Sequence, residues 1–478
     1  MNYLMITYIL GWVLNFEAGF LLLPWAVGMI YGEKSAFAFL IVAIGALCFG
    51  IPLTRKKPKD VVFYAKEGFV MVALSWLVLS IIGALPFVIS GDIPNIENAL
   101  FETISGFTTT GASILVDVDA LSKASIFWRS FTHWIGGMGV LVFIIAILPM
   151  SGGYNMHLMR AESPGPQVGK LVPKVRSTAM ILYKIYFVIT LAEIIALLIA
   201  GMPLFEALTI TFGTVGTGGF APTTAGMADY TWAQQTIITI FMVLSGVNFG
   251  VYYLMVCRKF GQVLKSEEVK YYLGIFVGAT AIITLNVVNH FETIGQSIHH
   301  AAFQVASIMT TTGYATADFN LWPEESKTIL VLLMFIGACS GSTGGGMKVS
   351  RIIILLKTVK KELASLIHPR SIKKIRIEGR MVEHEVLRSI NVFFVTFMML
   401  VAGSIFLLSF DGYDFATNFT AVAATINNIG PGLSLVGPMS NYEHFSAFSK
   451  VVLMFDMLVG RLELFPMLLL FAPGTWKK

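Results

Sequence analysis

The sequence predicts an all-α polytopic membrane protein, in which two N-terminal transmembrane helices precede four repeats of helix, re-entrant half-helix and helix around a common centre. Three observations lead to this prediction: the composition, the lengths of the apolar runs, and a turn that recurs four times. Of the 478 residues, 56% are hydrophobic and 13% are charged, and the mean hydropathy is +0.76. Soluble domains carry roughly 25% charged residues. A soluble enzyme, a disordered chain and a disulfide scaffold are therefore excluded.

The membrane-spanning helices are predicted from ten apolar runs. A helix needs about 20 mostly apolar residues to cross a hydrocarbon core of roughly 30 Å. Runs of that length lie at 4–30, 36–54, 68–90, 127–149, 178–200, 233–257, 270–289, 327–357, 386–410 and 447–472. With the N-terminus inside, 27 of the 33 Lys and Arg residues fall on the inner side and five on the outer side. Inner loops carry this excess of positive charge, so both termini are expected to be cytosolic.

Acidic residues gather on the outer side of this topology. One interpretation is that outer loops simply need polar residues. The other is a negative outer vestibule that concentrates cations before they enter. The sequence leaves both open.

A Gly- and Thr-rich turn occurs four times, each time after a helical stretch too short to cross the membrane. About twelve helical residues reach only some 18 Å, which indicates a re-entrant half-helix. The turns are FTTTGAS (107–113), GTVGTGGF (213–220), TTTGYAT (310–316) and NNIGPGL (427–433). Aligning Gly111, Gly216, Gly313 and Gly430 divides the chain into two N-terminal helices (1–60), pore repeats 1 (61–176) and 2 (177–265), repeat 3 with a basic cytosolic hairpin (266–384), and repeat 4 (385–478).

These turns have the chemistry of an ion filter. Non-helical backbone at membrane depth survives only where protein buries it or water reaches it, and glycine permits the backbone angles that turn successive carbonyls toward one axis. Four such loops would form a ring of oxygens that replaces the water around an alkali cation, with the negative ends of the half-helices directed at the ion. We therefore expect a central ion pore with a filter made of Thr109, Thr110, Gly111, Thr214, Val215, Gly216, Thr311, Thr312, Gly313, Asn428, Ile429 and Gly430. Close helix packing by small residues is the alternative, and four recurrences in one context disfavour it.

A second glycine cluster interrupts the run at 327–357. Within GACSGSTGGG (337–346), eight of ten residues are Gly, Ser or Thr, and each helical glycine costs about 1 kcal/mol relative to alanine. The cluster predicts an unwound intramembrane loop beneath the filter that acts as a gate. The gate residues are Gly337, Ser340, Gly341, Ser342, Thr343, Gly344, Gly345 and Gly346, together with Arg461. The alternative is a kinked helix that lets its neighbours pack closely.

Arg461 lies midway along the last apolar run, where a charge costs at least ~2.5–3.5 kcal/mol. We expect its side chain to project into the pore beneath the filter. A salt bridge to Glu463 or Asp456 of a dimer mate is the alternative. Glu17 and Glu193 also lie within predicted spans, where they are expected to pair internally, and they are weaker proton-relay candidates.

The four turns, the stretch HWIGGMGVLV (133–142), the run GACSGSTGGGMKVSR (337–351) and VGRLELFP (459–466) closely resemble the Trk/Ktr/HKT superfamily of potassium transporters. The two extra N-terminal spans and the turn INNIGPGL are most similar to the membrane subunits of bacterial Trk systems. The resemblance implies potassium as the transported ion, no organic cofactor, a homodimer among membrane lipids, and a cytosolic nucleotide-binding (TrkA-like) gating ring as partner. It also implies a location in the bacterial cytoplasmic (inner) membrane and no nucleic-acid partner.

The expected function is inward potassium conduction through a gated, channel-like pore. An enzyme is not expected, because no catalytic cluster is visible in the sequence. The alternative is a proton- or sodium-coupled symporter, which would need inverted repeats and ionisable midplane residues; the predicted repeats are parallel and their turns hold no ionisable side chain. Because no turn reads TVGYG, selectivity against sodium is expected to be looser than in a dedicated potassium channel. The positive charge of the segment 357–384 has two interpretations. It is either the excess of Lys and Arg usual in cytosolic loops, or a surface that docks an acidic partner.

Overall fold

The computed structural model describes residues 1–55, 58, 65–139, 175–369 and 374–476. Helices dominate it, and the strands in the described residues form one short hairpin. Six helices are long and apolar enough to cross a membrane, and a bent pair makes a seventh candidate. The prediction of an all-α polytopic membrane protein is confirmed.

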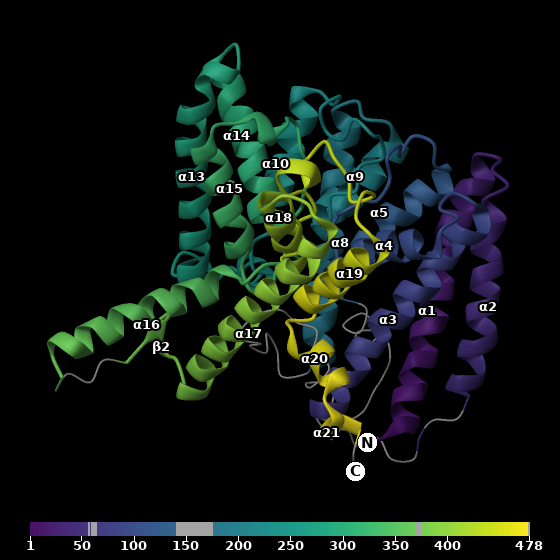
Figure 1. Ribbon diagram of the computed structural model, residues 1–478, viewed down its shortest axis with the longest axis horizontal. Helices are drawn as coiled ribbons and strands as arrows, with labels where there is room; N and C mark the ends of the chain where they lie inside the picture. Colours follow the sequence, from purple (N-terminus) through teal and green to yellow (C-terminus); the bar gives the residue numbers. More distant parts are fainter. Residues whose placement is uncertain (56–57, 59–64, 140–174, 370–373, 477–478) are drawn as a thin grey trace.

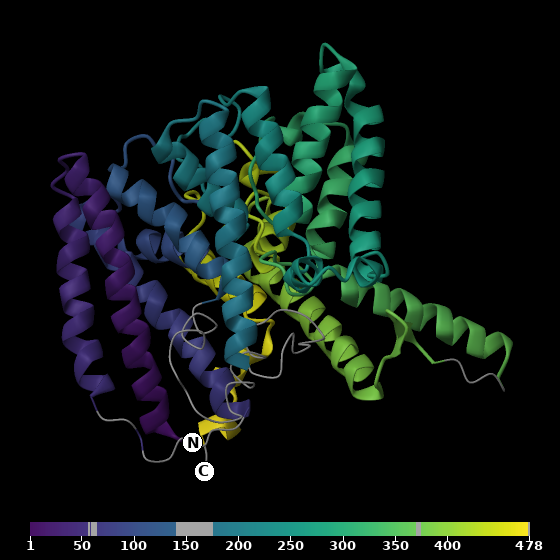
Figure 2. The same ribbon diagram turned by 180° about the vertical axis from the view of Figure 1, so that it is seen from behind.

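Helices α1 (Tyr3–Ile30) and α2 (Ala36–Thr54) stand as an antiparallel pair at one edge of the molecule (Figures 1 and 2). They approach closely because Gly28 has no side chain: a Cβ there would lie 2.7 Å from the Cβ of Ala36. The turn between them is tied to the first repeat, since Glu33 accepts hydrogen bonds from the backbone N–H groups of Lys123 and Ala124 at 2.7 and 3.1 Å. The pair therefore caps a helix of the pore repeats.

The remaining chain forms four units, each with a long helix, a half-helix and a final helix. The first comprises α3 (Ala65–Ser90), α4 (Ile96–Phe107) and α5 (Lys123–Met138); the second α8 (Val175–Ile199), α9 (Leu204–Gly216), α10 (Trp232–Ser245), α11 (Phe249–Val256) and α12 (Phe260–Val263); the third α13 (Glu267–Val287), α14 (Ile294–Met309), α15 (Glu324–Ile336) and α16 (Val349–Ile367); the fourth α17 (His384–Leu408), α18 (Phe415–Ile426), α19 (Ala447–Arg461), α20 (Phe465–Phe471) and α21 (Pro473–Trp476). Short 3₁₀ turns η1 (Val288–His290), η2 (Phe319–Leu321), η3 (Ser409–Asp411) and η4 (Ser434–Val436) lie between them.

The final helices of the second and fourth repeats are interrupted where the sequence predicted continuous spans. Spans were expected to run unbroken over 233–257 and 447–472, and both expectations are wrong. Helices α10 and α11 meet at 91°, and α19 ends before Glu463 and Leu464, whose φ angles are +56° and +68°. Helix α5 ends at Gly139 (φ +79°); the rest of the predicted span 127–149, and of the motif 133–142, lies outside the described residues. The described helices α5, α10 and α19 each end beside the end of a half-helix, since a Cβ on Gly136, Gly246 or Gly460 would lie 1.8 Å from Phe107, 2.9 Å from Thr310 or 2.0 Å from Ile426.

The break in the second repeat shows the local cause. Asn248 accepts a hydrogen bond from the N–H of Gly250 at 2.8 Å and so starts a new helix. Two residues earlier, a Cβ on Gly246 would lie 2.4 Å from the hydroxyl of Tyr272, so this glycine admits a neighbouring helix. Asn as a helix N-cap and Gly at a close approach are standard signals, and an apolar-run count ignores both.

On the side where both termini lie, α16 leaves the body of the molecule (Figures 1 and 2). The hairpin of β1 (Arg376–Ile377) and β2 (Arg380–Met381) follows it, pairing Arg376 with Met381. Lys357 of α16 pairs with Glu267 at 2.5 Å, and Ser266 donates to Glu378 at 2.9 Å. These contacts dock the hairpin on the start of α13.

Candidate functional site

The four turns follow one backbone path. A non-glycine residue in each adopts the left-handed region, with φ between +55° and +61°, and a glycine with positive φ follows two residues later. The first set is Thr109, Thr217, Thr311 and Asn428, and the second is Gly111, Gly219, Gly313 and Gly430. A β-branched residue at positive φ is a strained outlier, and such strain gathers at functional sites.

Hydrogen bonds at the helix ends give the same register. In the first turn, Thr109 N–H bonds to Gly106 O and Thr110 N–H to Ser105 O, a Schellman-type ending. The pattern recurs in the second turn at Thr217 and Gly218, in the third at Thr311 and Thr312, and in the fourth at Asn428 and Ile429.

The predicted register in the second repeat is therefore wrong by three residues. Thr214, Val215 and Gly216 lie inside α9, where the Thr214 hydroxyl bonds back to Ile210 O at 2.9 Å. The residues that occupy the turn are Thr217, Gly218 and Gly219. The letters TVGTGG fit both registers, but distance from the helix start distinguishes them. From Asn95 to Gly111, from Pro203 to Gly219 and from Asp414 to Gly430, the interval between N-cap and glycine is 16 residues, and in the third repeat, from Thr293 to Gly313, it is 20. Gly216 would give only 13.

The four turns are in contact in a closed ring. A Cβ on Gly111 would lie 2.0 Å from Gly218 O of the second repeat. In the same way, a Cβ on Gly219 would lie 2.0 Å from Thr312 O, and a Cβ on Gly313 would lie 2.0 Å from Ile429 O. A Cβ on Gly430 would lie 2.8 Å from Thr110 O. Each glycine thus packs on a backbone carbonyl of the next repeat, in sequence order, around one centre.

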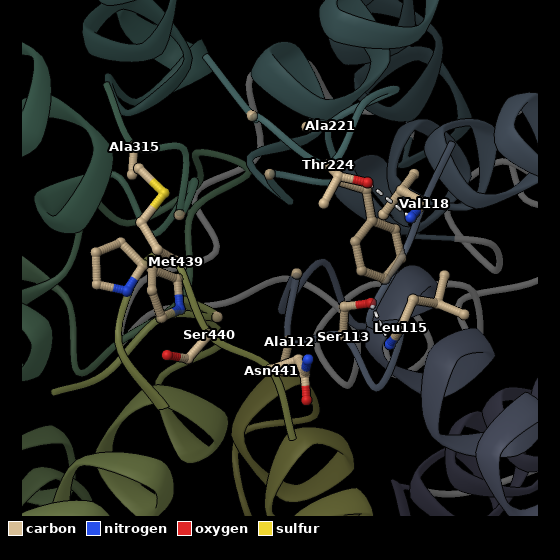
Figure 3. A pocket seen from close by; sticks show the side chains of 18 of the residues that line it. Ala112, Ser113, Leu115, Val118, Ala221, Thr224, Ala315, Met439, Ser440 and Asn441 are labelled. Atoms are coloured by element: carbon tan, nitrogen blue, oxygen red, sulfur yellow. Dashed lines mark hydrogen bonds between the residues drawn. The ribbon is translucent and has the colours of Figure 1, made fainter. Parts of the chain in front are cut away.

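A cavity of about 180 Å³ opens above this ring, and all four glycines line it. Figure 3 shows side chains from the four repeats around it, including Ser113, Thr224, Ala315 and Asn441. Among the described residues, no carboxylate lines the cavity, and its one charged group is Arg129. These lining residues therefore do not form a negative vestibule.

Loops beyond the turns are bonded to one another around the cavity. Each neighbouring pair of repeats shares at least one hydrogen bond: Val118 N–H to Thr224 Oγ1 (2.9 Å), Met227 N–H to Ala315 O (3.3 Å), Ser434 N–H to Asn320 Oδ1 (2.9 Å) and Tyr442 N–H to Ser113 O (2.8 Å). Apolar counting could not have found these bonds, because they join segments that are far apart in the sequence, from 88 residues for Met227 and Ala315 to 329 residues for Tyr442 and Ser113.

His133 explains why the second turn has glycine at position 218. Its Nδ1 bonds to Gly106 O at 2.7 Å, and its Nε2 accepts from Phe220 N–H at 3.2 Å, so the ring joins the first and second repeats. A Cβ on Gly218 would lie 2.2 Å from this ring. Nothing in the sequence indicates this role of His133, because a histidine next to a tryptophan in a helix carries no distinguishing pattern.

Residues 337–348 form a loop between α15 and α16, as the glycine cluster predicted, and not a kinked helix. Gly337, Gly341 and Gly346 have φ angles between +70° and +73°. The loop bonds directly to the turns above it: Gly345 N–H donates to Thr311 Oγ1 at 2.6 Å and Gly346 N–H to Asn427 O at 3.1 Å. A Cβ on Gly345 would lie 2.4 Å from Asn427 O. The loop can therefore pack against the fourth turn only with glycine at this position.

Two charged side chains hold this loop in place. Glu268, at the start of α13, accepts from Ser340 N–H at 2.7 Å. Arg461 donates to Thr343 O at 2.8 Å and, on its other side, to Gly136 O and Gly137 O at 2.5 and 2.8 Å. Arg461 therefore lies below the turns, where it bonds the loop to the end of α5.

The carboxylates considered as alternative partners of Arg461 have other contacts in this chain. Ser404 donates to Asp456 at 2.8 Å, and Glu463 pairs with Arg351. Glu17 and Glu193 are fully buried and form no ion pair with any described residue. The expectation that Glu17 and Glu193 pair internally is not met among those residues.

Comparison with known proteins places the chain in a family. The family model described as "TrkH: Cation transport protein" matches residues 35–478. The chain is 37% identical to the Trk system potassium uptake protein TrkH of Salmonella typhimurium strain LT2, over the full length of both, and 33% identical to TrkG of Escherichia coli K12 over 99% of this chain and 98% of that one. The crystal structure of the potassium transporter TrkH from Vibrio parahaemolyticus superposes over all of both chains with a TM-score of 0.89, at 32% identity. The chain thus belongs to the TrkH family of cation transport proteins.

Proposed function

We propose that this protein takes up potassium across the bacterial cytoplasmic membrane through a channel-like pore formed by its four repeats. Relatives that match its full length are named potassium uptake proteins. The geometry that supports the proposal is the ring of turns, in which four equivalent carbonyls (Thr110, Gly218, Thr312 and Ile429) lie against the glycines of the neighbouring repeats. Hard oxygen ligands of this kind suit an alkali cation.

In this proposal the filter consists of residues 109–111, 217–219, 311–313 and 428–430, so that Thr217, Gly218 and Gly219 replace Thr214, Val215 and Gly216. Side chains stiffen it from behind. The hydroxyls of Thr108 and Thr110 lie 2.8 Å apart, as do those of Thr310 and Thr312. Asn428 Nδ2 donates to Thr110 Oγ1 at 3.0 Å and links the fourth repeat to the first.

The loop 337–348 is proposed to be the gate. It lies directly below the filter, and Arg461 adds a positive charge beside it. In the state described, the loop bonds to the third and fourth turns, so conduction requires it to move aside. Control by a cytosolic nucleotide-binding subunit of the TrkA type and assembly as a homodimer with cytosolic termini are part of the proposal. The relatives' designation as members of a Trk system and the exposed position of the hairpin near α16 support the partner.

Flux through the purified protein in liposomes tests this function. A potassium gradient alone, with no proton or sodium gradient, should drive steady ⁸⁶Rb⁺ uptake, and a membrane potential should set its direction. Uptake that required an opposing or accompanying proton or sodium gradient would overturn the channel-like mechanism.

A coupled symporter is the second candidate, and one observation favours it. Glu17 and Glu193 are buried carboxylates without an ion-pair partner among the described residues, and such groups are suited to carrying protons. Against it, the repeats follow one another around the centre and the turns hold no ionisable side chain. A Glu17→Gln, Glu193→Gln double variant that keeps full ⁸⁶Rb⁺ uptake would exclude proton coupling through these residues.

A further inference from the structure

A buried ion pair lies beside the outer side of the filter in the first repeat. Glu102 of α4 and Arg129 of α5 are 1% and 2% exposed, and their closest atoms are 2.7 Å apart. Glu102 also accepts from the Ser113 hydroxyl at 3.0 and 3.1 Å and from Ile114 N–H at 3.1 Å. The carboxylate is therefore fixed to the chain two and three residues beyond the filter glycine Gly111.

Arg129 extends the same contact to the second repeat. Its Nη1 donates to Ala221 O at 3.4 Å, and its guanidinium carbon lies 4.1 Å from the centre of the Phe220 ring. Ala221 stands two residues beyond Gly219, as Ser113 stands two beyond Gly111. The pair thus holds equivalent positions in two adjacent turns, and Arg129 reaches the wall of the cavity above them.

The other three repeats build the same turn without this pair. Nine residues before the filter glycine, the four repeats carry Glu102, Ile210, Gln304 and Ala421. Seven residues after the N-cap of the following helix, they carry Arg129, Ile238, Leu330 and Leu453. The fold of the turn therefore does not require charges here.

Stability does not account for the pair either. Taking two charges out of water is costly, and well-packed apolar residues in their place are often as stable or more so. The pair instead provides directional hydrogen bonds. The forked guanidinium and the carboxylate, which has four hydrogen-bond contacts, fix two loops relative to each other more tightly than apolar contact does.

We propose that Glu102 and Arg129 are positioning residues that set the spacing of the first and second turns, and thereby the discrimination of potassium from sodium. This inference rests on the proposed function, since it assigns the selectivity of that filter. A filter that discriminates by its oxygens depends on where those oxygens are held, and this pair holds half of the ring.

The test is ⁸⁶Rb⁺ uptake by the purified full-length protein in liposomes, with K⁺ or Na⁺ as competitor. In the double variant Glu102→Ala, Arg129→Leu, both positions take the residues of the fourth repeat, so no buried charge is left alone. We expect this variant to remain monodisperse and to conduct, while the ratio of sodium to potassium inhibition constants falls about tenfold, as for loss of a charged hydrogen bond. Unchanged discrimination in this variant would overturn the proposal.

Single variants distinguish positioning from a general packing defect. Glu102→Gln leaves the guanidinium uncompensated at the cavity and should raise the KM for Rb⁺ at low ionic strength, whereas Arg129→Gln leaves a carboxylate and should lower it. Equal shifts of the same sign would instead indicate a packing defect and overturn the proposal. Lys450→Met is the matched control, because it removes an ion pair with Glu97 (3.8 Å) and a hydrogen bond to Asn98 (2.9 Å), both at the start of α4 and not at the turns. If the wild-type protein showed no potassium-selective uptake, the proposed function itself would fail. That outcome differs from unchanged discrimination in the double variant and from equal shifts in the single variants.

Discussion

At the scale of single residues, the glycines of the four turns are among the positions of the described structure that tolerate a side chain least. Gly111 combines a φ of +77° with a neighbouring carbonyl oxygen 2.0 Å from where a Cβ would stand. An L-residue pays roughly 1–2 kcal/mol for the left-handed conformation, and the backbone clash adds to this cost.

Gly111→Ala should therefore lower ⁸⁶Rb⁺ uptake at least about a hundredfold while the protein remains folded in detergent. Gly19→Ala in α1 is the control, because nothing lies within 4 Å of its Cβ position. Comparable uptake by the two variants would contradict the contact ring.

Arg461 joins the loop 337–348 to the end of α5 by three backbone hydrogen bonds, one to the loop and two to α5. If this loop is the gate, as proposed, removal of Arg461 should favour its open state. We expect Arg461→Ala to raise ⁸⁶Rb⁺ flux in the absence of any partner by about tenfold, the effect of losing one to two net hydrogen bonds. Arg461→Lys keeps the charge but cannot reach three carbonyls at once, so it separates the hydrogen bonds from an electrostatic barrier. If uptake and gating of Arg461→Ala matched wild type, a purely structural role would be supported instead.

At the scale of elements, the helix caps connect parts of the fold that lie far apart in sequence. Glu33 sits between α1 and α2, yet it caps α5 through the N–H groups of Lys123 and Ala124. Glu33→Ala should lower the free energy of unfolding by about 1–2 kcal/mol, measured as a lower thermal midpoint in detergent. Glu324→Ala removes an exposed pair with Lys327 and should change the midpoint little; equal losses would contradict the capping role.

Two adjacent glutamates at the start of α13 should behave differently. Glu268→Ala leaves Ser340 N–H without its acceptor, which costs about 1–3 kcal/mol and should raise flux through the partner-free protein. Glu267→Ala breaks the partly exposed pair with Lys357 and a hydrogen bond from Glu378 N–H, neither of which involves the loop, so basal flux should stay at the wild-type level. The flux of both variants can be measured in single-channel recordings or in liposomes. Equal flux through the Glu268→Ala and Glu267→Ala variants would show that Glu268 does not hold the loop.

Some elements of the fold can be predicted from the sequence, and others cannot. The half-helices and the Gly-rich loop were predictable, because apolar length and glycine clustering are local signals. The bends after α10 and α19 were not, because an apolar run reads the same whether it is straight or broken. The register of the second turn failed for a similar reason: Gly216 and Gly219 are equivalent as letters, and only the helix start at Pro203 separates them.

At the scale of the whole molecule, the features that make a site arise between repeats. The ring of glycines against carbonyls, the His133 link and the contact of Arg129 with Ala221 each join segments from different repeats. No pattern within one repeat indicates them, since their partners are fixed only when the repeats close around a centre. The fourfold count was visible in the sequence, whereas the differences among the four repeats needed the structure.

The most direct test of the central claim is to locate a heavy monovalent ion in the protein. Rb⁺ or Tl⁺ in an anomalous-scattering experiment should appear on the axis enclosed by the carbonyls of Thr110, Gly218, Thr312 and Ile429, at similar distances from all four. An ion bound elsewhere in the described fold, with none inside this ring, would contradict the account.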